Sequence, residues 1–420
     1  MSTIPRARRM AMIAPKQVQA GQSVAADTPA ACSSASPPGA LLEPAPRLGL
    51  ADHHVQIRDR EGLVYGWRNE LPEHISGPAD DAVFPLSVLA RGCGGGRSAN
   101  SDVDGSEDGQ EALSPPRGMP NTTPECGAAL RELLRDKLLE VGAVHVRGLP
   151  LSTADDFSGL VDSLGWDVVK LGGGGTERST VSRNVRTASN EPPQQTIEPH
   201  MDMAHSTSHP KRIAFFALAG PPPGVGGETV LTDMRAVYRA LDEAGIVGEF
   251  ARRGGVAYHK RLWSRERVDH TYTWQQFFFT EDLAEATRMI RELDPTASVS
   301  DDGRIDYQEV LDAVYPHPHT GEPLWFNGVH TNHHSYYEEG AHIDTSDGPP
   351  MDTTFADGTA IPVGTIATIR AAFWNNSVAI PLRDGDVVFV DNMLASHGRM
   401  GWVPGNPRKV LLTHFSGGPL

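Results

Sequence analysis

The segment His200-Met201-Asp202 contains two side chains that could bind one metal ion. In an extended segment, residues i and i+2 project from the same face, so an imidazole nitrogen of His200 and a carboxylate oxygen of Asp202 can reach the same ion. Such pairs also occur by chance, and the alternative here is a polar turn beside Pro199. The pair therefore predicts metal chemistry only if further ligands come from elsewhere in the chain.

A further histidine, His397, follows an apolar stretch that ends at Asp391-Asn392. Two histidines and one carboxylate make the facial triad of non-haem Fe(II) oxygenases, which leaves coordination positions open for a co-substrate and O2. In a jelly roll, such ligands come from distant strands that meet at the mouth of the barrel. Taken alone, His397 fits a capped loop histidine better.

Arg408 opens an apolar run that ends at Leu412. A guanidinium on a buried strand needs an anionic partner, and its planar fork matches a carboxylate. Upstream, Gly226-Gly227 permits a tight turn, and the Thr229 hydroxyl could share an anion with Arg408. The alternatives are a salt bridge from Arg408 to a protein carboxylate and an ordinary loop at 226–229.

The elements that must position these residues are short. Leucines at helical spacing over 130–139 predict a helix that ends at Gly142, and Thr153 and Asp233 are expected to cap two further helices. Strands are expected at 143–147, 213–218, 229–232, 386–390 and 409–415, and 229–232 can pair back on 213–218. Strands separated by loops, with helices clustered early, predict an α+β fold with a double-stranded β-helix (jelly roll) core and flanking helices.

Composition limits the partners and the compartment. The formal net charge of −16 argues against a duplex nucleic acid or an anionic membrane as partner. No apolar run approaches the ~18 residues of a membrane span. The three cysteines all precede residue 130, and their odd number disfavours a disulfide scaffold and favours a reducing, cytoplasmic location.

Two segments have low complexity. Residues 1–46 are rich in Ala, Ser, Pro and Gln and are expected to form a disordered tail, although a basic, acid-poor start also fits a transit peptide and an organellar location. Residues at about 92–124 contain several glycines and then an acidic run, which we interpret as a mobile insertion, because no phosphate-loop Lys follows the glycines. The remainder, 47–420, is expected to be a single domain that carries this insertion.

These features occur in a fixed order, and from about Leu130 to Phe415 the chain resembles the taurine dioxygenase-like (TauD/TfdA) family of Fe(II)/2-oxoglutarate-dependent oxygenases. The resemblance is closest to the branch found in nonribosomal peptide and amino-acid-modifying pathways. The shared motifs are 142–148, His200-x-Asp202, 212–218 with the Gly-Gly-Glu-Thr that follows it, 320–327, 391–399 and 408–412.

The resemblance implies that His200, Asp202 and His397 are the catalytic iron ligands. It implies that Arg408 and Thr229 bind the distal carboxylate of the co-substrate 2-oxoglutarate. The implied activity is that of a dioxygenase, which uses O2 to hydroxylate an unactivated C–H bond and releases succinate and CO2. Desaturation and ring formation stay open, because they share the same oxidising chemistry.

Two departures from the family narrow the substrate. Leu412 stands where taurine enzymes of the family resemble one another in a second Arg that holds the sulfonate, so taurine is disfavoured. Asp202 is present where related halogenases have a small residue, so halogenation is disfavoured. We expect a small, amino-acid-like substrate, free or carrier-bound, and a homo-oligomer is possible.

The resemblance also places substrate contacts before the first His and after Trp325-Phe326-Asn327. The candidates are Arg183, Asn184, Arg186, His205, Asn327, His330 and Arg399. The histidines at 330, 333 and 334 could form a second metal site, a titrating lid or plain surface.

Two other classes of protein compete with the oxygenase. A catalytically silent jelly-roll binding module has no need of His200, Asp202, His397 and Arg408 together. A zinc hydrolase built on the same ligands would leave Arg408 without a role.

Overall fold

The computed structural model describes residues 42–44, 84–90, 124–170, 178–268, 272–339, 345 and 348–418. The chain divides after Pro38, and all described residues belong to the second unit. The expected tail at 1–46 lies outside the described residues except for strand β1 (Leu42–Pro44), which pairs with β2 (Leu86–Ala90) and so corrects that part of the expectation. The expected insertion also lies outside them, up to the start of helix α2 (Pro124–Val141).

The large sheet has nine strands. Its order is β1, β2, β3 (Ala143–Arg147), β17 (Val387–Asp391), β8 (Arg212–Ala219), β19 (Lys409–Gly417), β6 (Val185–Thr187) and β5 (Thr180–Ser182), and β4 (Asp167–Val169) also pairs with β19. All pairs are antiparallel except β2 with β3. The strands expected at 143–147, 213–218, 386–390 and 409–415 are thereby confirmed within a residue or two.

A four-stranded sheet packs against the large one. It runs β16 (Ser377–Ile380), β9 (Thr229–Asp233), β18 (Ala395–Arg399) and β7 (Ile197–His200). The core between the sheets takes Phe215 and Leu412 from the large sheet and Leu231 from the small one. The expectation that 229–232 pairs back on 213–218 is wrong: β9 pairs with β16 and β18, in the other sheet.

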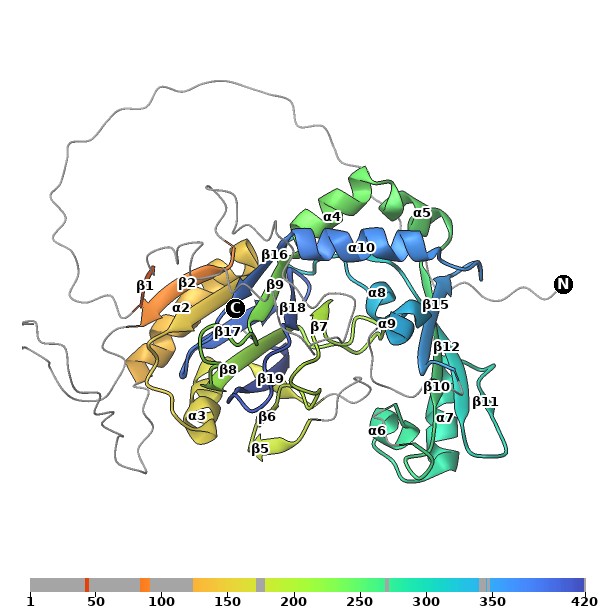
Figure 1. Cartoon of the computed structure of the whole chain (residues 1–420), viewed down its shortest axis with the longest axis horizontal. Coiled ribbons are helices and arrows are strands. Elements are labelled where there is room, and N and C mark those ends of the chain that lie inside the picture. Colours follow the sequence, from red (N-terminus) through yellow and green to blue (C-terminus); the bar gives the residue numbers. More distant parts are fainter. Residues whose placement is uncertain are drawn as a thin grey trace, which may run out of the picture. The chain divides into compact units, whose positions relative to one another are not determined.

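Two helices cover the other face of the large sheet, α2 and α3 (Ala154–Leu164) (Figure 1). Side chains alternate along each strand. Phe216 and Leu411 therefore pack against the two helices, while the adjacent Phe215 and Leu412 face the small sheet. Gly142 ends α2 with a φ of 77°, and Thr153 caps α3 through a capping box, as the sequence predicts.

The remaining elements lie mostly between β9 and β16 in the sequence. The helices are α4 (Met234–Glu243), α5 (Ile246–Arg252), α6 (Trp274–Phe278), α7 (Leu283–Leu293), α8 (Val329–Asn332), α9 (His334–Glu339) and α10 (Val363–Asn375). The strands are β10 (Val256–Leu262), β11 (Ser298–Val299), β12 (Ile305–Leu311), β13 (Val314–Pro316), β14 (Pro323–Trp325) and β15 (Met351–Phe355). Mixed sheets and helices confirm the α+β class, but the helices are not clustered early.

Cys126, in α2, is disulfide-bonded. Among the helices within the described ranges, none is both long and apolar enough to cross a bilayer.

Candidate active site

The candidate active site forms where β7 and β18 pair. His200 is the last residue of β7, and its partner across the pair is His397 in β18, with ring centroids 4.6 Å apart. A turn directly after β7 brings Asp202 Oδ1 to 3.4 Å from His200 Nε2 and 3.7 Å from His397 Nε2. The three side chains therefore converge, although Asp202 arrives through a turn rather than along a strand face, and His397 lies in a strand rather than a loop.

Neighbouring groups fix the orientation of this triad. His200 Nδ1–H donates to the Glu198 carbonyl oxygen at 2.8 Å, which leaves the lone pair of Nε2 directed to the site. Asn392 holds the turn, because its side chain both donates to the Asp202 carbonyl and accepts from the Asp202 N–H, each at 2.9 Å.

Two residues that sequence reasoning missed hold the Asp202 carboxylate. His414 Nε2 lies 2.7 Å from Oδ2, and Arg178 Nη2 lies 3.1 Å from Oδ2 and 3.3 Å from Oδ1. The strand pattern did place His414 on β19, but only the pairing of β19 with β8 turns its ring to Asp202. Arg178 has no local signal in the sequence.

The electrostatics favour the protonation states that bind a metal. Burial alone would raise the pKa of Asp202, but Arg178, His200 and His414 outweigh it and hold that pKa well below its usual range. Burial and the neighbouring His200 lower the pKa of His397 to about 3. A carboxylate anion and neutral imidazoles are the forms that a divalent metal requires, and two nitrogens with one oxygen leave coordination positions open. These residues therefore fit Fe(II).

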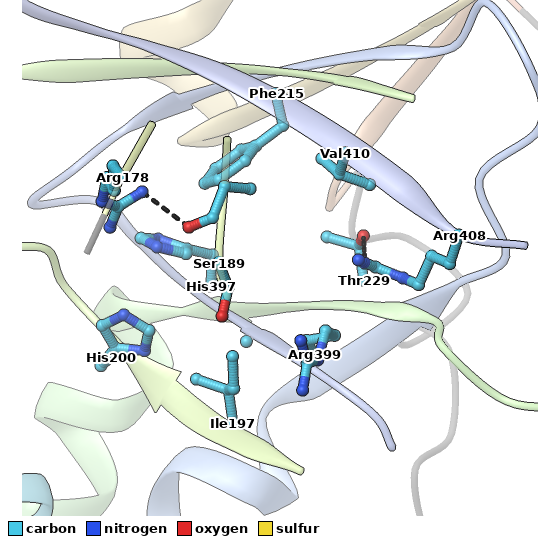
Figure 2. A pocket seen from close by; sticks show the side chains of 12 residues that line it. Arg178, Ser189, Ile197, His200, Phe215, Thr229, His397, Arg399, Arg408 and Val410 are labelled. Atoms are coloured by element: carbon cyan, nitrogen blue, oxygen red, sulfur yellow. Dashed lines mark hydrogen bonds between the residues drawn. The ribbon is translucent and has the colours of Figure 1, made fainter. Parts of the chain in front are cut away.

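A pocket with about 540 Å³ of empty space, part of it open to solvent, adjoins both histidines (Figure 2). Ile197, Phe215 and Val410 give it apolar walls, and its polar lining is Arg178, Ser189, Thr229, Arg399 and Arg408. An apolar pocket with a few cationic groups beside a possible metal site is what a small anionic ligand requires.

Arg408 offers the pocket a guanidinium that is influenced by the charge of the buried Glu228 but is not in an ion pair with it. Its Nε donates to the Gly227 carbonyl oxygen at 2.7 Å and its Nη2 to Thr229 Oγ1 at 3.4 Å (Figure 2), and within the described ranges no carboxylate pairs with it. Gly227 has a φ of 84°, and a Cβ there would approach Arg408 Cδ to 2.9 Å, so this contact requires glycine. Burial and the nearby Arg399 lower the pKa of Arg408 to about 9, which still leaves it a cation at neutral pH.

Arg399 lines the same pocket but is held by the backbone. Its Nη atoms donate to the carbonyl oxygens of Glu191, Pro192 and Gln195, and its guanidinium lies over the Trp402 ring. This arginine fixes the 191–195 loop that leads into β7.

None of the three candidates on the β5–β6 hairpin lines this pocket. Arg183 is 71% exposed and pairs with Asp162, and Asn184 bonds to Ser158 and Asp162 of α3, so neither lines the pocket. Arg186 is half-buried and its Nη2 donates to the Arg178 carbonyl oxygen at 3.4 Å.

The other candidates lie on the far side of β7. Asn327 is fully buried and bonds to the Ala313 carbonyl oxygen and the Val329 N–H. His330 is fully buried, with Nε2 2.9 Å from the Pro199 carbonyl oxygen. The backbone of His205 accepts a bond from Lys260. None of these three lines the pocket that adjoins the triad.

A second group of possible metal ligands is formed by His333, His334 and Asp352. His333 Nδ1 accepts from the Ser335 N–H at 3.2 Å, and its Nε2 lies 3.3 Å from the Ile361 carbonyl oxygen. Both ring nitrogens of His333 are therefore engaged.

The chain matches the family model described as "Taurine catabolism dioxygenase TauD, TfdA family" over residues 107–414. It therefore belongs to this family, and it is an Fe(II)- and 2-oxoglutarate-dependent dioxygenase that uses O2.

Individual relatives are distant. The chain is 28% identical over 283 residues to the clavaminate synthase-like protein At3g21360 of Arabidopsis thaliana, covering 66% of this chain and 82% of that protein. It is 28% identical over 267 residues to the dapdiamide synthesis protein DdaC of Enterobacter agglomerans, covering 62% and 79%. Among solved structures, PvcB from Pseudomonas aeruginosa is similar with a TM-score of 0.41 at 12% identity, covering 80% of this chain and 86% of that chain.

Proposed function

We propose that this dioxygenase hydroxylates an unactivated C–H bond of a small, amino-acid-like substrate and releases succinate and CO2. His200 Nε2, His397 Nε2 and Asp202 Oδ1 would hold the Fe(II). Arg408 and Thr229 would bind the distal carboxylate of 2-oxoglutarate. The two facing sheets would form the double-stranded β-helix, with the site at one end of the small sheet.

One observation carries this proposal: the converging triad borders the same pocket as the guanidinium of Arg408, which forms no ion pair with any carboxylate of the described residues. Fe(II) with 2-oxoglutarate supplies the activation of O2 that no protein side chain provides. The protein orients the two ligands and, through Ile197, Phe215 and Val410, keeps water from the reacting centre.

The substrate class rests on relatives and charge. One relative is named for dapdiamide synthesis and another is clavaminate synthase-like, which supports a small molecule, free or carrier-bound. The net charge of −16 makes a nucleic acid a poor partner.

The test is O2-dependent formation of succinate and CO2 from 2-oxoglutarate, followed by the mass of the product. Hydroxylation adds one oxygen atom to the substrate, whereas desaturation or ring closure removes two hydrogens. A silent binding module gives no succinate, and a zinc hydrolase acts without O2 or 2-oxoglutarate. Either of the last two results would overturn the proposal.

A further inference from the structure

Arg186 projects from the large sheet toward the same interior as the triad. Its neighbour Val185 packs into the core under α2 and α3, so alternation turns Arg186 to the opposite face. Across the β6–β19 pair it stands opposite Leu412, whose side chain lies in the core between the two sheets. Residues directly opposite each other share a face, so both observations agree.

The guanidinium of Arg186 is incompletely bonded. Its Nε and Nη1 are buried without a hydrogen-bond partner, and only Nη2 donates, to the Arg178 carbonyl oxygen. Within the described part of the chain no carboxylate forms an ion pair with it. Burial and the charge of Arg178 lower the pKa of Arg186, which shows that its surroundings do not compensate the charge.

Nearby arginines differ in this respect. Arg178 pairs with the Asp202 carboxylate and Arg183 with Asp162. Arg399 donates to three backbone carbonyl oxygens, and only its Nε is buried without a partner. A buried guanidinium with two unused donors is costly unless an anion completes it, and its fork is shaped for a carboxylate.

The anion that would complete Arg186 cannot be the carboxylate that Arg408 is proposed to bind, because the two arginines lie at different places along β19. Arg408 immediately precedes β19, whereas Arg186 pairs with Leu412 inside β19, about 13 Å further along at roughly 3.3 Å per residue. Arg186 is instead linked to the triad, since its partner Arg178 and the nearby His414 both contact Asp202.

We propose that Arg186 binds a free carboxylate of the substrate through Nε and Nη1 and so sets which end of the molecule faces the metal site. This inference rests on the proposed function and narrows it to substrates that carry such a carboxylate.

The test compares Arg186→Met with Arg183→Met, a matched control on the same hairpin whose arginine is exposed. The probes are the protein L-amino acids and their primary amides, with stimulated succinate formation as the readout. Wild type and Arg183→Met should prefer the acid, and Arg186→Met should raise the KM for the acid about 10- to 100-fold and leave that for the amide unchanged. Arg186→Lys should restore part of the preference.

A second readout separates binding from a structural role. Because Met removes an uncompensated buried charge, Arg186→Met should unfold at the same or a higher temperature than wild type without ligand. A lower unfolding temperature together with an intact preference for the acid would overturn the inference.

Four other outcomes are informative. Equal use of acid and amide by wild type, or a change confined to the 2-oxoglutarate KM, would also overturn the role of Arg186. So would wild type that forms succinate from 2-oxoglutarate but responds to no probe. Wild type that forms no succinate under any condition would instead refute the proposed function.

Discussion

Within the part of the chain that the structure describes, two groups combine two histidines with one aspartate, and their ring nitrogens are engaged differently. At the triad, His200 Nε2 and His397 Nε2 both face Asp202 Oδ1, while the other carboxylate oxygen is held by His414 and Arg178. In the second group, formed by His333, His334 and Asp352, the ring of His333 is bonded at both nitrogens.

Asp352, the aspartate of the second group, also has hydrogen-bond partners of its own. Asp352 Oδ1 accepts from the N–H groups of His334 and Thr353 and lies 3.1 Å from His334 Nδ1. The group is also more exposed, with His334 and Asp352 side chains both 37% accessible. Residue types alone therefore do not define a metal site: the lone pairs must be left free by the surrounding hydrogen bonds.

The largest effect is expected at the triad. Asp202→Ala removes the carboxylate ligand and leaves Arg178 and His414 without their anion, so turnover should fall well beyond about 100-fold, the upper range for an outer partner. Succinate formation measures this. A variant lacking Asp202 that still hydroxylated at the normal rate would contradict the ligand assignment.

Arg408→Ala tests the co-substrate end of the pocket. Loss of a charge-assisted pair should raise the 2-oxoglutarate KM roughly 30- to 100-fold, with a smaller effect on the rate at saturation. Arg408→Lys keeps the positive charge but loses the planar fork of donors, so its 2-oxoglutarate KM should lie between those of wild type and Arg408→Ala. An unchanged 2-oxoglutarate KM in Arg408→Ala would remove Arg408 from the site.

His414→Ala tests the bonds that orient the Asp202 carboxylate. The loss of the 2.7 Å contact should weaken Fe(II) affinity roughly 10-fold, as measured by competition with a chelator. Ser335→Ala is the matched control, because it removes the Ser335 hydroxyl that lies 2.9 Å from His333 Nδ1, and it should leave the Fe(II) affinity unaltered. If both substitutions lowered the Fe(II) affinity equally, the triad could not be distinguished from the second group as the metal site.

The smallest effect is expected from His334→Ala with Asp352→Ala. Because both side chains are partly exposed, stability to urea should change by less than about 1 kcal/mol, and turnover should stay at the wild-type level. A loss of turnover with the fold intact would show that the second group takes part in the reaction.

The sequence predicted the ligand candidates because they lie in short motifs. His200 and Asp202 are nearly adjacent and His397 follows an apolar strand, and the order of these motifs carried the family resemblance that implied them as ligands. The strands at 143–147 and 409–415 were likewise predicted because alternation and flanking glycine or proline are local signals.

The rest of the fold and of the site could not be predicted, because it depends on contacts between segments that lie far apart in the sequence. The sheet that contains β9 depends on β16 and β18, which come much later in the chain. The role of His414 depends on where the pairing of β19 places it, and Arg178 reaches Asp202 from a segment outside any strand. Asn327 bonds to a backbone carbonyl that no motif reveals.

The most direct measurement is an anaerobic Fe(II) titration of wild type, Asp202→Ala and the His334→Ala, Asp352→Ala double variant. We predict one tightly bound equivalent in wild type, the same equivalent in the double variant and none in Asp202→Ala. Iron that stays bound in Asp202→Ala but disappears from the double variant would show that the metal occupies the other group of histidines.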